Sequence, residues 1–274
     1  MLKERKKIGI ALGSGGFRGL AHIGVLKVLE ENGIRPDYIS GASVGAIVAA
    51  YYAVYANVDD LEQNLNDWPI NSLYKFIDLN WRGGFIAGKK FYQFLDKEFA
   101  GKTFSKTKIP LQIIATDLEK GAPFVFSSGR LAPAVRASIS VPLMLKPASH
   151  DGKQFVDGGL CNPVPLDLLR EMGAEILIGV NLYHKNEFVG RKFTMPNVAL
   201  RSARIVMYNL AKADILKADI VITPDTSPII ISQSLKKYNR ESVDKLIKIG
   251  EAAAKKVLPE LKALINGEVF ENKK

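Results

Sequence analysis

The sequence predicts an α/β protein with three layers, in which helices cover both faces of a mainly parallel central sheet. Two observations carry this prediction. The first 56 residues alternate short apolar runs with helical patterns, which is the βαβα arrangement of parallel sheets with right-handed crossovers. Residues 175–181 and 219–223 are near-continuous apolar runs, typical of strands buried on both faces. Ligands of such sheets bind at the carboxyl ends of the strands, so we expect the functional site there.

The first unit contains two turns of the same kind. A strand over Ile8–Leu12 ends at a cluster of glycines, and apolar residues then recur at helical spacing over 20–31. A second short strand follows over Pro36–Ser40, and the next helix extends from Gly41 to about Ala56. Because both Gly-containing turns follow strands of one parallel sheet, they are expected at the same sheet edge.

Residues 57–108 are less regular than the segments on either side. Polar and aromatic residues are mixed there, and we expect only one helix, over Lys89–Phe99. We interpret this segment as a cap or an insertion.

The rest of the chain is expected to complete the same sheet. Apolar runs predict further strands over Ile109–Ala115, Pro123–Phe126 and Gln154–Val156. Helices are expected at about 198–217 and at about 240–265, the second with one apolar stripe. Since no repeat, linker or low-complexity tract interrupts the chain, we expect a single domain over 1–274 with its core at about 8–165.

Composition excludes several classes of protein. With 47% hydrophobic and 24% charged residues among 274, the chain is neither fibrous nor disordered. The single cysteine, Cys161, excludes an internal disulfide and a multi-cysteine zinc site, which suits a reducing compartment. The longest membrane-like run, Ala46–Ala56, has 11 residues, well short of the roughly 20 needed to span a bilayer. No signal-peptide segment follows the charged start, so we expect a cytoplasmic protein.

The formal net charge of +10 favours anionic partners. Half of this excess lies in residues 185–217, where seven basic and two acidic residues give +5. This segment is a candidate for peripheral contact with an anionic membrane. The alternative is a solvated helix face, with Phe193, Met195 and Met207 in the core. Nothing in the chain resembles a nucleic-acid-binding module, so no nucleic-acid partner is expected.

The sequence Gly41-Ala-Ser-Val-Gly45 has the pattern of a nucleophile elbow. Such an elbow needs a strand before it, a helix after it and small residues around the serine, because the tight turn leaves little space for side chains. All three conditions are met here, which indicates Ser43 as a nucleophile. The alternative is that Ser43 only caps a helix whose glycines, Gly41 and Gly45, pack closely.

The earlier turn, Gly13-Ser-Gly-Gly-Phe-Arg-Gly19, directs backbone amides toward a helix N-terminus and therefore attracts negative charge. Two uses compete. A dinucleotide-binding fold would cradle a pyrophosphate there, but it also needs an acid after the second strand, where this chain has Ser40-Gly-Ala-Ser43. An acyl-transfer enzyme would use the amides as an oxyanion hole, with Arg18 adding positive charge to the turn. The elbow at Ser43 favours the second use.

A serine nucleophile needs a base, and the chain has three histidines. His22 lies inside a predicted helix, where a structural or solvent-facing imidazole is expected, and His150 lies at a predicted hairpin turn. His184 follows a strand, and together with Ser43 and Asp157 it would reproduce the Ser, Asp, His chain order of α/β-hydrolases.

Asp157 offers a base that needs no histidine. It ends an apolar strand and is followed by Gly158-Gly159, which lets another backbone or a substrate approach its carboxylate. A carboxylate can accept the serine proton directly if an apolar setting raises its pKa toward the working pH. Both a dyad and a triad remain open on these residues.

Together these features make the chain resemble the patatin-like phospholipase family. Three motifs carry the resemblance, in the family's order and at family-like distances: Gly13–Leu26, Gly41–Gly45 and Asp157–Gly159. Ala115–Leu118 and Ala137–Pro142 are smaller echoes of the family pattern.

The resemblance covers about residues 8–165, with a continuation expected to 265. It implies a bacterial-type patatin-like serine acyl hydrolase with a Ser–Asp dyad, in which Ser43 is the nucleophile and Asp157 the base. Its substrate would be a lipid or another acyl ester, and neither a metal nor a cofactor would be needed.

The resemblance also implies an oxyanion hole formed by the amides of Gly15 and Gly16 and assisted by Arg18. Ser14 departs from the family pattern, in which many members have a third glycine. Because Ser14 precedes the two donor positions, we expect little effect on them. Two other readings stay open: a catalytically silent lipid-binding or regulatory protein, and a nucleotide-binding α/β protein that uses the Gly-rich turn.

Overall fold

The structure is a computed structural model of the whole chain, described here for residues 5–67, 88–185, 193–227, 229 and 240–268. Part of the predicted cap, residues 68–87, lies outside the described residues. So do three of the charged residues counted above in the basic segment, Glu187, Arg191 and Lys192.

The described strands form one eight-stranded sheet in the order β5-β6-β3-β2-β1-β7-β8, with β4 paired to β3. The central strands β3, β2, β1, β7 and β8 are parallel, whereas β4, β5 and β6 add antiparallel pairs at one side. The strand bounds are β1 Ile8–Leu12, β2 Tyr38–Ala42, β3 Leu111–Asp117, β4 Ala122–Phe126, β5 Ala148–His150, β6 Lys153–Val156, β7 Ile176–Val180 and β8 Ile220–Ile222.

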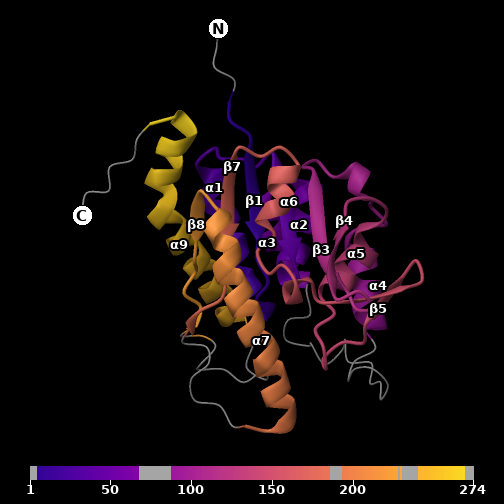
Figure 1. Cartoon of the computed structure of the whole chain (residues 1–274). Helices are drawn as coiled ribbons and strands as arrows, with labels where there is room; N and C mark the ends of the chain where they lie inside the picture. The colour runs from indigo at the N-terminus through magenta and orange to yellow at the C-terminus, as the bar shows by residue number, and fades with distance from the viewer. Residues whose placement is uncertain (1–4, 68–87, 186–192, 228, 230–239, 269–274) are drawn as a thin grey trace.

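Helices cover both faces of the sheet, as the three-layer prediction requires (Figure 1). One face carries α1, α2, α5 and α9 above the larger core, and the other carries α6 and α7 above a smaller core. The helix bounds are α1 Ala21–Glu31, α2 Val44–Tyr55, α3 Val58–Asp67, α4 Lys89–Glu98, α5 Leu131–Ser138, α6 Leu166–Glu171, α7 Met195–Asp214 and α9 Arg240–Asn266. All five residues of β1 and all five of β7 are buried, which is the burial expected of strands covered on both sides.

Three helices were not predicted from the sequence. The segment after residue 57 begins with α3, which docks through its buried Val58 and Leu61 and through an ion pair between Glu62 and Lys27 of α1. Its three apolar residues, Val58, Leu61 and Leu65, do follow helical spacing, but they lie among seven polar residues, and the segment was interpreted as irregular. Helices α5 and α6 were also missed, since each is at most eight residues long.

The region of the predicted basic helix also differs from expectation in one respect. Helix α7 begins at Met195, three residues earlier than predicted, and ends at Asp214 before a short 3-10 turn. The alternative that placed Phe193 and Met195 in the core is wrong, because both side chains are exposed, whereas Met207 is buried. No helix in the described part of the chain is both long and apolar enough to cross a membrane.

Candidate active site

Ser43 lies in the turn between β2 and α2, at the carboxyl edge of the sheet. Its backbone has φ 55° and ψ −125°, a conformation that is strained for a residue with a side chain and typical of a residue held at a functional site. The turn closes tightly on β1: a Cβ at Gly45 would lie 2.0 Å from the Leu12 carbonyl oxygen. The N–H of Ser43 donates to Ser138 Oγ at 2.8 Å, so a neighbouring helix holds the turn in place.

The hydroxyl of Ser43 donates a hydrogen bond to Asp157, with 2.6 Å between Oγ and Oδ2. Asp157 follows β6 and is 2% exposed. Its second carboxylate oxygen, Oδ1, accepts a hydrogen bond from the Gly159 N–H at 2.8 Å. Gly158, between Asp157 and Gly159, packs against the carbonyl of Ile114. The structure therefore brings the two residues together although 114 positions separate them in the chain.

The backbone of Asp157 is fixed on both sides. Its N–H donates to the Ser140 carbonyl at 3.0 Å, and its carbonyl accepts from Thr116 Oγ1 at 2.9 Å. Thr116, Ser138 and Ser140 were not predicted as site residues. They lie in the two short echoes of the family pattern, residues 115–118 and 137–142, which were the available signal.

Burial determines the protonation behaviour of Asp157. Desolvation raises the pKa of this carboxyl to about 6, although the hydrogen bonds from Ser43 and from the Gly159 N–H oppose the shift. At neutral pH Asp157 is therefore ionised, but it is a stronger base than an exposed aspartate. A carboxylate in this state can accept a proton from the hydroxyl that already donates to it.

The Gly-rich turn lies beside the serine, because β1 and β2 are parallel neighbours with Leu12 opposite Gly41. The Gly13 N–H donates to the Val180 carbonyl and the Ser14 N–H to the Pro163 carbonyl. Within the described residues, the structure records no acceptor for the next two amides, those of Gly15 and Gly16. Gly16 has φ +59°, which favours glycine. Adjacent amides of this kind can bind a negatively charged oxygen.

Arg18 acts on this turn in a way that the sequence did not indicate. Its guanidinium is 6% exposed; Nε donates to the Gly15 carbonyl at 2.8 Å and Nη1 to the Leu182 carbonyl at 2.7 Å. In a planar trans peptide the C=O and the N–H point in opposite directions. By holding the Gly15 carbonyl, Arg18 therefore fixes the direction of the Gly16 N–H.

Tyr183 supports the same turn from the loop after β7. The Arg18 guanidinium lies 4.8 Å from the centre of its ring, and its hydroxyl is 2.7 Å from Ser14 Oγ. The tyrosine hydroxyl also donates to the sulfur of Met207 in α7 at 3.3 Å. The departure from the family pattern at Ser14 thus forms a buried contact behind the turn.

The three histidines lie apart from the contact between Ser43 and Asp157. His22 is fully buried, its Nε2 is 2.8 Å from the Gly13 carbonyl, and burial lowers its pKa to about 4, so it is neutral and structural as predicted. His150 ends β5 opposite Lys153 in a hairpin. The Nε2 of His184 contacts the Pro224 carbonyl at 2.6 Å. The contact between Ser43 and Asp157 is direct, with no imidazole between the two side chains.

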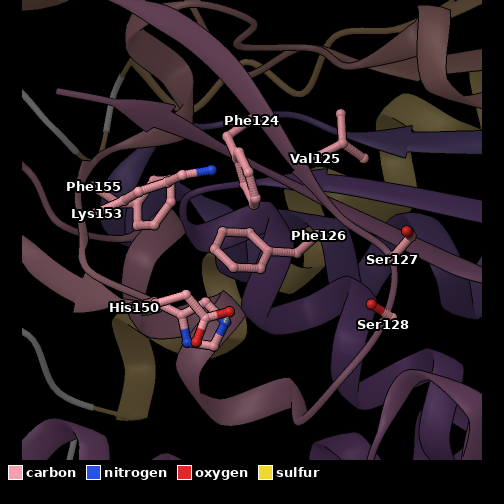
Figure 2. Close-up of a pocket in the computed structure, with 9 residues that line it drawn as sticks. Phe124, Val125, Phe126, Ser127, Ser128, His150, Lys153 and Phe155 are labelled. Carbon is pink, nitrogen blue, oxygen red and sulfur yellow. Dashed lines mark ion pairs between the residues drawn. The ribbon is translucent and has the colours of Figure 1, made fainter. Parts of the chain in front are cut away.

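A small pocket of about 150 Å³ lies elsewhere, between β4 and the β5–β6 hairpin. Figure 2 shows the rings of Phe124, Phe126 and Phe155 gathered on one wall. Lys153 Nζ lies 5.0 Å from the centre of the Phe124 ring. Neither Ser43 nor Asp157 lines this pocket, so it is separate from the candidate active site. Among the described residues no cluster of side chains could hold a metal ion.

Known proteins are similar to this chain over part of its length. Residues 10–170 match the family model described as patatin-like phospholipase. The chain is 32% identical over 186 residues to "patatin-like phospholipase domain-containing protein 6" of Mus musculus, which is 66% of this chain and 14% of that protein. It is 30% identical over 181 residues to "lysophospholipase nte1" of Aspergillus fumigatus, which is 65% of this chain and 12% of that protein.

These relatives are much longer than the region they share with this chain. An uncharacterized NTE family protein of Mycobacterium bovis is 31% identical over 177 residues, 64% of this chain and 49% of that protein. Among solved structures, VipD from Legionella pneumophila has a TM-score of 0.55 at 13% identity, covering 94% of this chain and 67% of that chain. The likeness to VipD shows the fold alone.

Proposed function

Because this chain belongs to the patatin-like phospholipase family, we propose that it is a serine acyl hydrolase that cleaves carboxylic ester bonds of lipids through a Ser–Asp dyad. One observation carries the proposal: Ser43 Oγ donates to the buried carboxylate of Asp157 at 2.6 Å, beside two adjacent backbone amides. A nucleophile, a base and oxyanion donors are the three parts that acyl transfer needs.

In the first half of the reaction, Asp157 accepts the proton of Ser43 as Oγ attacks the ester carbonyl carbon. The carbonyl oxygen becomes negatively charged, and the N–H groups of Gly15 and Gly16 stabilise it. The carboxylic acid form of Asp157 then gives its proton to the leaving alcohol as the C–O bond breaks. An acyl group is left on Ser43.

In the second half, water attacks the acyl-enzyme while Asp157 accepts one of its protons. The same two amides stabilise the second oxyanion. Collapse of this intermediate releases a carboxylic acid and returns the proton to Ser43. Each step uses groups of this chain and water only, so the reaction needs neither a metal nor a cofactor.

The substrate class follows from the family and from charge. A relative named as a lysophospholipase makes a phospholipid or lysophospholipid ester a good candidate. The basic residues between 185 and 217 support peripheral contact with an anionic membrane, where such substrates are found. A cytoplasmic location, expected from the single cysteine, stays a prediction.

Replacement of the nucleophile tests this proposal. Ser43→Ala removes the attacking oxygen, and we expect hydrolysis of a lysophospholipid and of a soluble short-chain ester to fall to background while the thermal unfolding curve stays cooperative. Ser105→Ala, in an exposed 3-10 turn, is the matched control and should keep full activity. Near-normal hydrolysis by Ser43→Ala would refute the proposal. Hydrolysis of neither ester by the unmodified chain would favour a silent lipid-binding protein.

A further inference from the structure

Large exposed apolar side chains gather in one segment of the described surface. Six of the eight such residues lie between residues 193 and 216, in α7 or next to it: Phe193, Met195, Val198, Ile205, Val206 and Leu216. Met195 is 85% exposed. Single exposed apolar residues are ordinary on a protein surface, but a contiguous group marks an interaction surface.

The apolar residues of α7 share one side of the helix. Met195, Val198 and Ile205 are spaced by three or seven residues, so they follow one another along the outer side, where Ser202 is also exposed. The opposite side contains Met207, which is buried in the smaller core. We call Met195, Val198, Ile205 and Val206 the outer stripe. Helix α7 therefore has apolar residues on two sides, only one of which the body of the protein covers.

The position of α7 places the outer stripe near the candidate active site. The helix follows β7, which is parallel to β1, so α7 begins beyond the edge that also carries the Gly-rich turn and Ser43. In Figure 1 the chain enters β1 from the top, and the first half of α7 projects below the body, on the side of the carboxyl ends of the strands. All residues from 193 to 199 are exposed.

The charges of α7 are complementary to an anionic surface. The helix contains three cations, Arg201, Arg204 and Lys212, and one acid, Asp214. Asp214 is buried, and its Oδ2 accepts a hydrogen bond from the Val164 N–H. Its carboxylate therefore does not face the surface to which α7 would bind. A helix with exposed apolar residues and only cations on its surface is suited to the headgroup region of an anionic bilayer.

A second copy of this chain fits the outer stripe less well. A two-fold contact would place the same surface against itself and so bring cations of α7 from both copies close together, since the helix has no exposed acid. An anionic lipid surface neutralises these charges and accepts the apolar side chains at the same time.

We infer that the outer stripe of α7, with its flanking cations, docks this protein on anionic lipid bilayers so that the edge carrying Ser43 faces the lipid. This inference rests on the proposed function, because it names the surface through which the hydrolase would meet its substrate. Docking by α7 would bring acyl esters to the Gly-rich turn.

Vesicle sedimentation of the full chain tests the docking surface. The probes are vesicles of phosphatidylcholine alone and vesicles with added phosphatidylglycerol, and the Ser43→Ala chain is used so that the lipid is not consumed. We expect binding only to the anionic vesicles. The double variant Val198→Ser/Ile205→Ser should reduce the partition coefficient by about tenfold or more, and Arg201→Gln/Lys212→Gln should reduce it by roughly thirtyfold.

The matched control changes two cations of α9, which covers the other face of the sheet. Lys255→Gln/Lys256→Gln removes two exposed cations from α9, and binding should change much less than with the α7 pair. An equal loss of vesicle binding in the α7 and α9 cation variants would show a bulk charge effect and overturn the inference. Unchanged vesicle binding of Val198→Ser/Ile205→Ser would also overturn it. A third contrary result would be a chain that sediments as a dimer, binds no vesicles and becomes monomeric with Val198→Ser/Ile205→Ser.

Activity separates this inference from the proposed function. In the chain with Ser43 present, the α7 variants should hydrolyse a soluble short-chain ester at the normal rate and vesicle lipids more slowly. Normal rates on both substrates would overturn the docking surface and leave the hydrolase in place. Vesicle binding that depends on α7, in a chain that hydrolyses neither ester, would keep the docking surface and refute the hydrolase.

Discussion

Asp157→Asn is expected to stabilise the folded protein while removing its activity. The carboxyl is 2% exposed, and desolvation raises its pKa from the ordinary 3.8 to about 6. The folded state therefore binds the proton more tightly than the unfolded state. The contribution of this carboxyl to stability is largest below pH 4 and falls as the pH rises from about 4 to about 6, because the folded protein must then bury a charge. Asparagine has no such charge at any pH.

The size of the effect follows from the shift. A difference of about two pKa units corresponds to roughly 3 kcal/mol. We expect Asp157→Asn to raise the free energy of unfolding by about 2 to 3 kcal/mol at pH 8. An amide is a weaker hydrogen-bond acceptor than a carboxylate, and this weaker hydrogen bonding reduces the gain. The gain should be well under 1 kcal/mol near pH 4, where the folded carboxyl is protonated and the unfolded carboxyl is about half protonated.

Urea unfolding at pH 4 and at pH 8 measures this difference. Asp151→Asn is the matched control, since this exposed hairpin aspartate has a positive φ that asparagine tolerates, and its substitution should change stability little at either pH. A destabilised Asp157→Asn protein at pH 8, or a gain of the same size at both pH values, would refute the argument that the folded protein buries a costly carboxylate.

Three other outcomes follow from the geometry of the site. The kcat/KM of the wild type should rise with pH through about 6 and then level off, since the carboxylate form of Asp157 is the active one; a pH–rate profile without that limb would contradict its role as base. Arg18→Gln should lower kcat by about ten- to a hundredfold with little change in KM, because the Gly16 N–H would lose its fixed direction; a raised KM at constant kcat would instead indicate substrate binding by Arg18. His184→Ala should leave kcat close to the wild-type value on a soluble ester, because its imidazole contacts the Pro224 carbonyl; a loss of several orders of magnitude would restore the triad.

The parts of the fold that could be predicted are those encoded locally. The strand Ile8–Leu12 and the helix after the Gly-rich turn each show a clear period, and the structure has β1 and α1 at those places. Helix α3 was missed although Val58, Leu61 and Leu65 have helical spacing, because its other seven residues are polar and resemble a loop in composition. Short helices such as α5 depend on tertiary packing more than on their own periodicity.

The candidate site also contains residues that could be predicted from the sequence and residues that could not. Ser43 and Asp157 were predicted because glycines mark the turns on which they lie, and the structure places their side chains in contact. Arg18 was expected to add positive charge to the Gly-rich turn, but its hydrogen bond to the Gly15 carbonyl could not be predicted, since a backbone acceptor leaves no trace in the sequence. Ser138 was missed for a similar reason: it supports Ser43 through a backbone N–H across 95 positions of the chain.

Labelling with a fluorophosphonate tests the central claim most directly, because the probe reacts readily only with a serine whose proton a neighbouring base accepts and whose oxyanion is stabilised. Mass spectrometry of the digested protein then locates the adduct. We predict a single adduct on Ser43, formed in the wild type and in His184→Ala but not in Asp157→Asn. An adduct on another serine, or equal labelling of Asp157→Asn, would contradict the Ser43–Asp157 dyad.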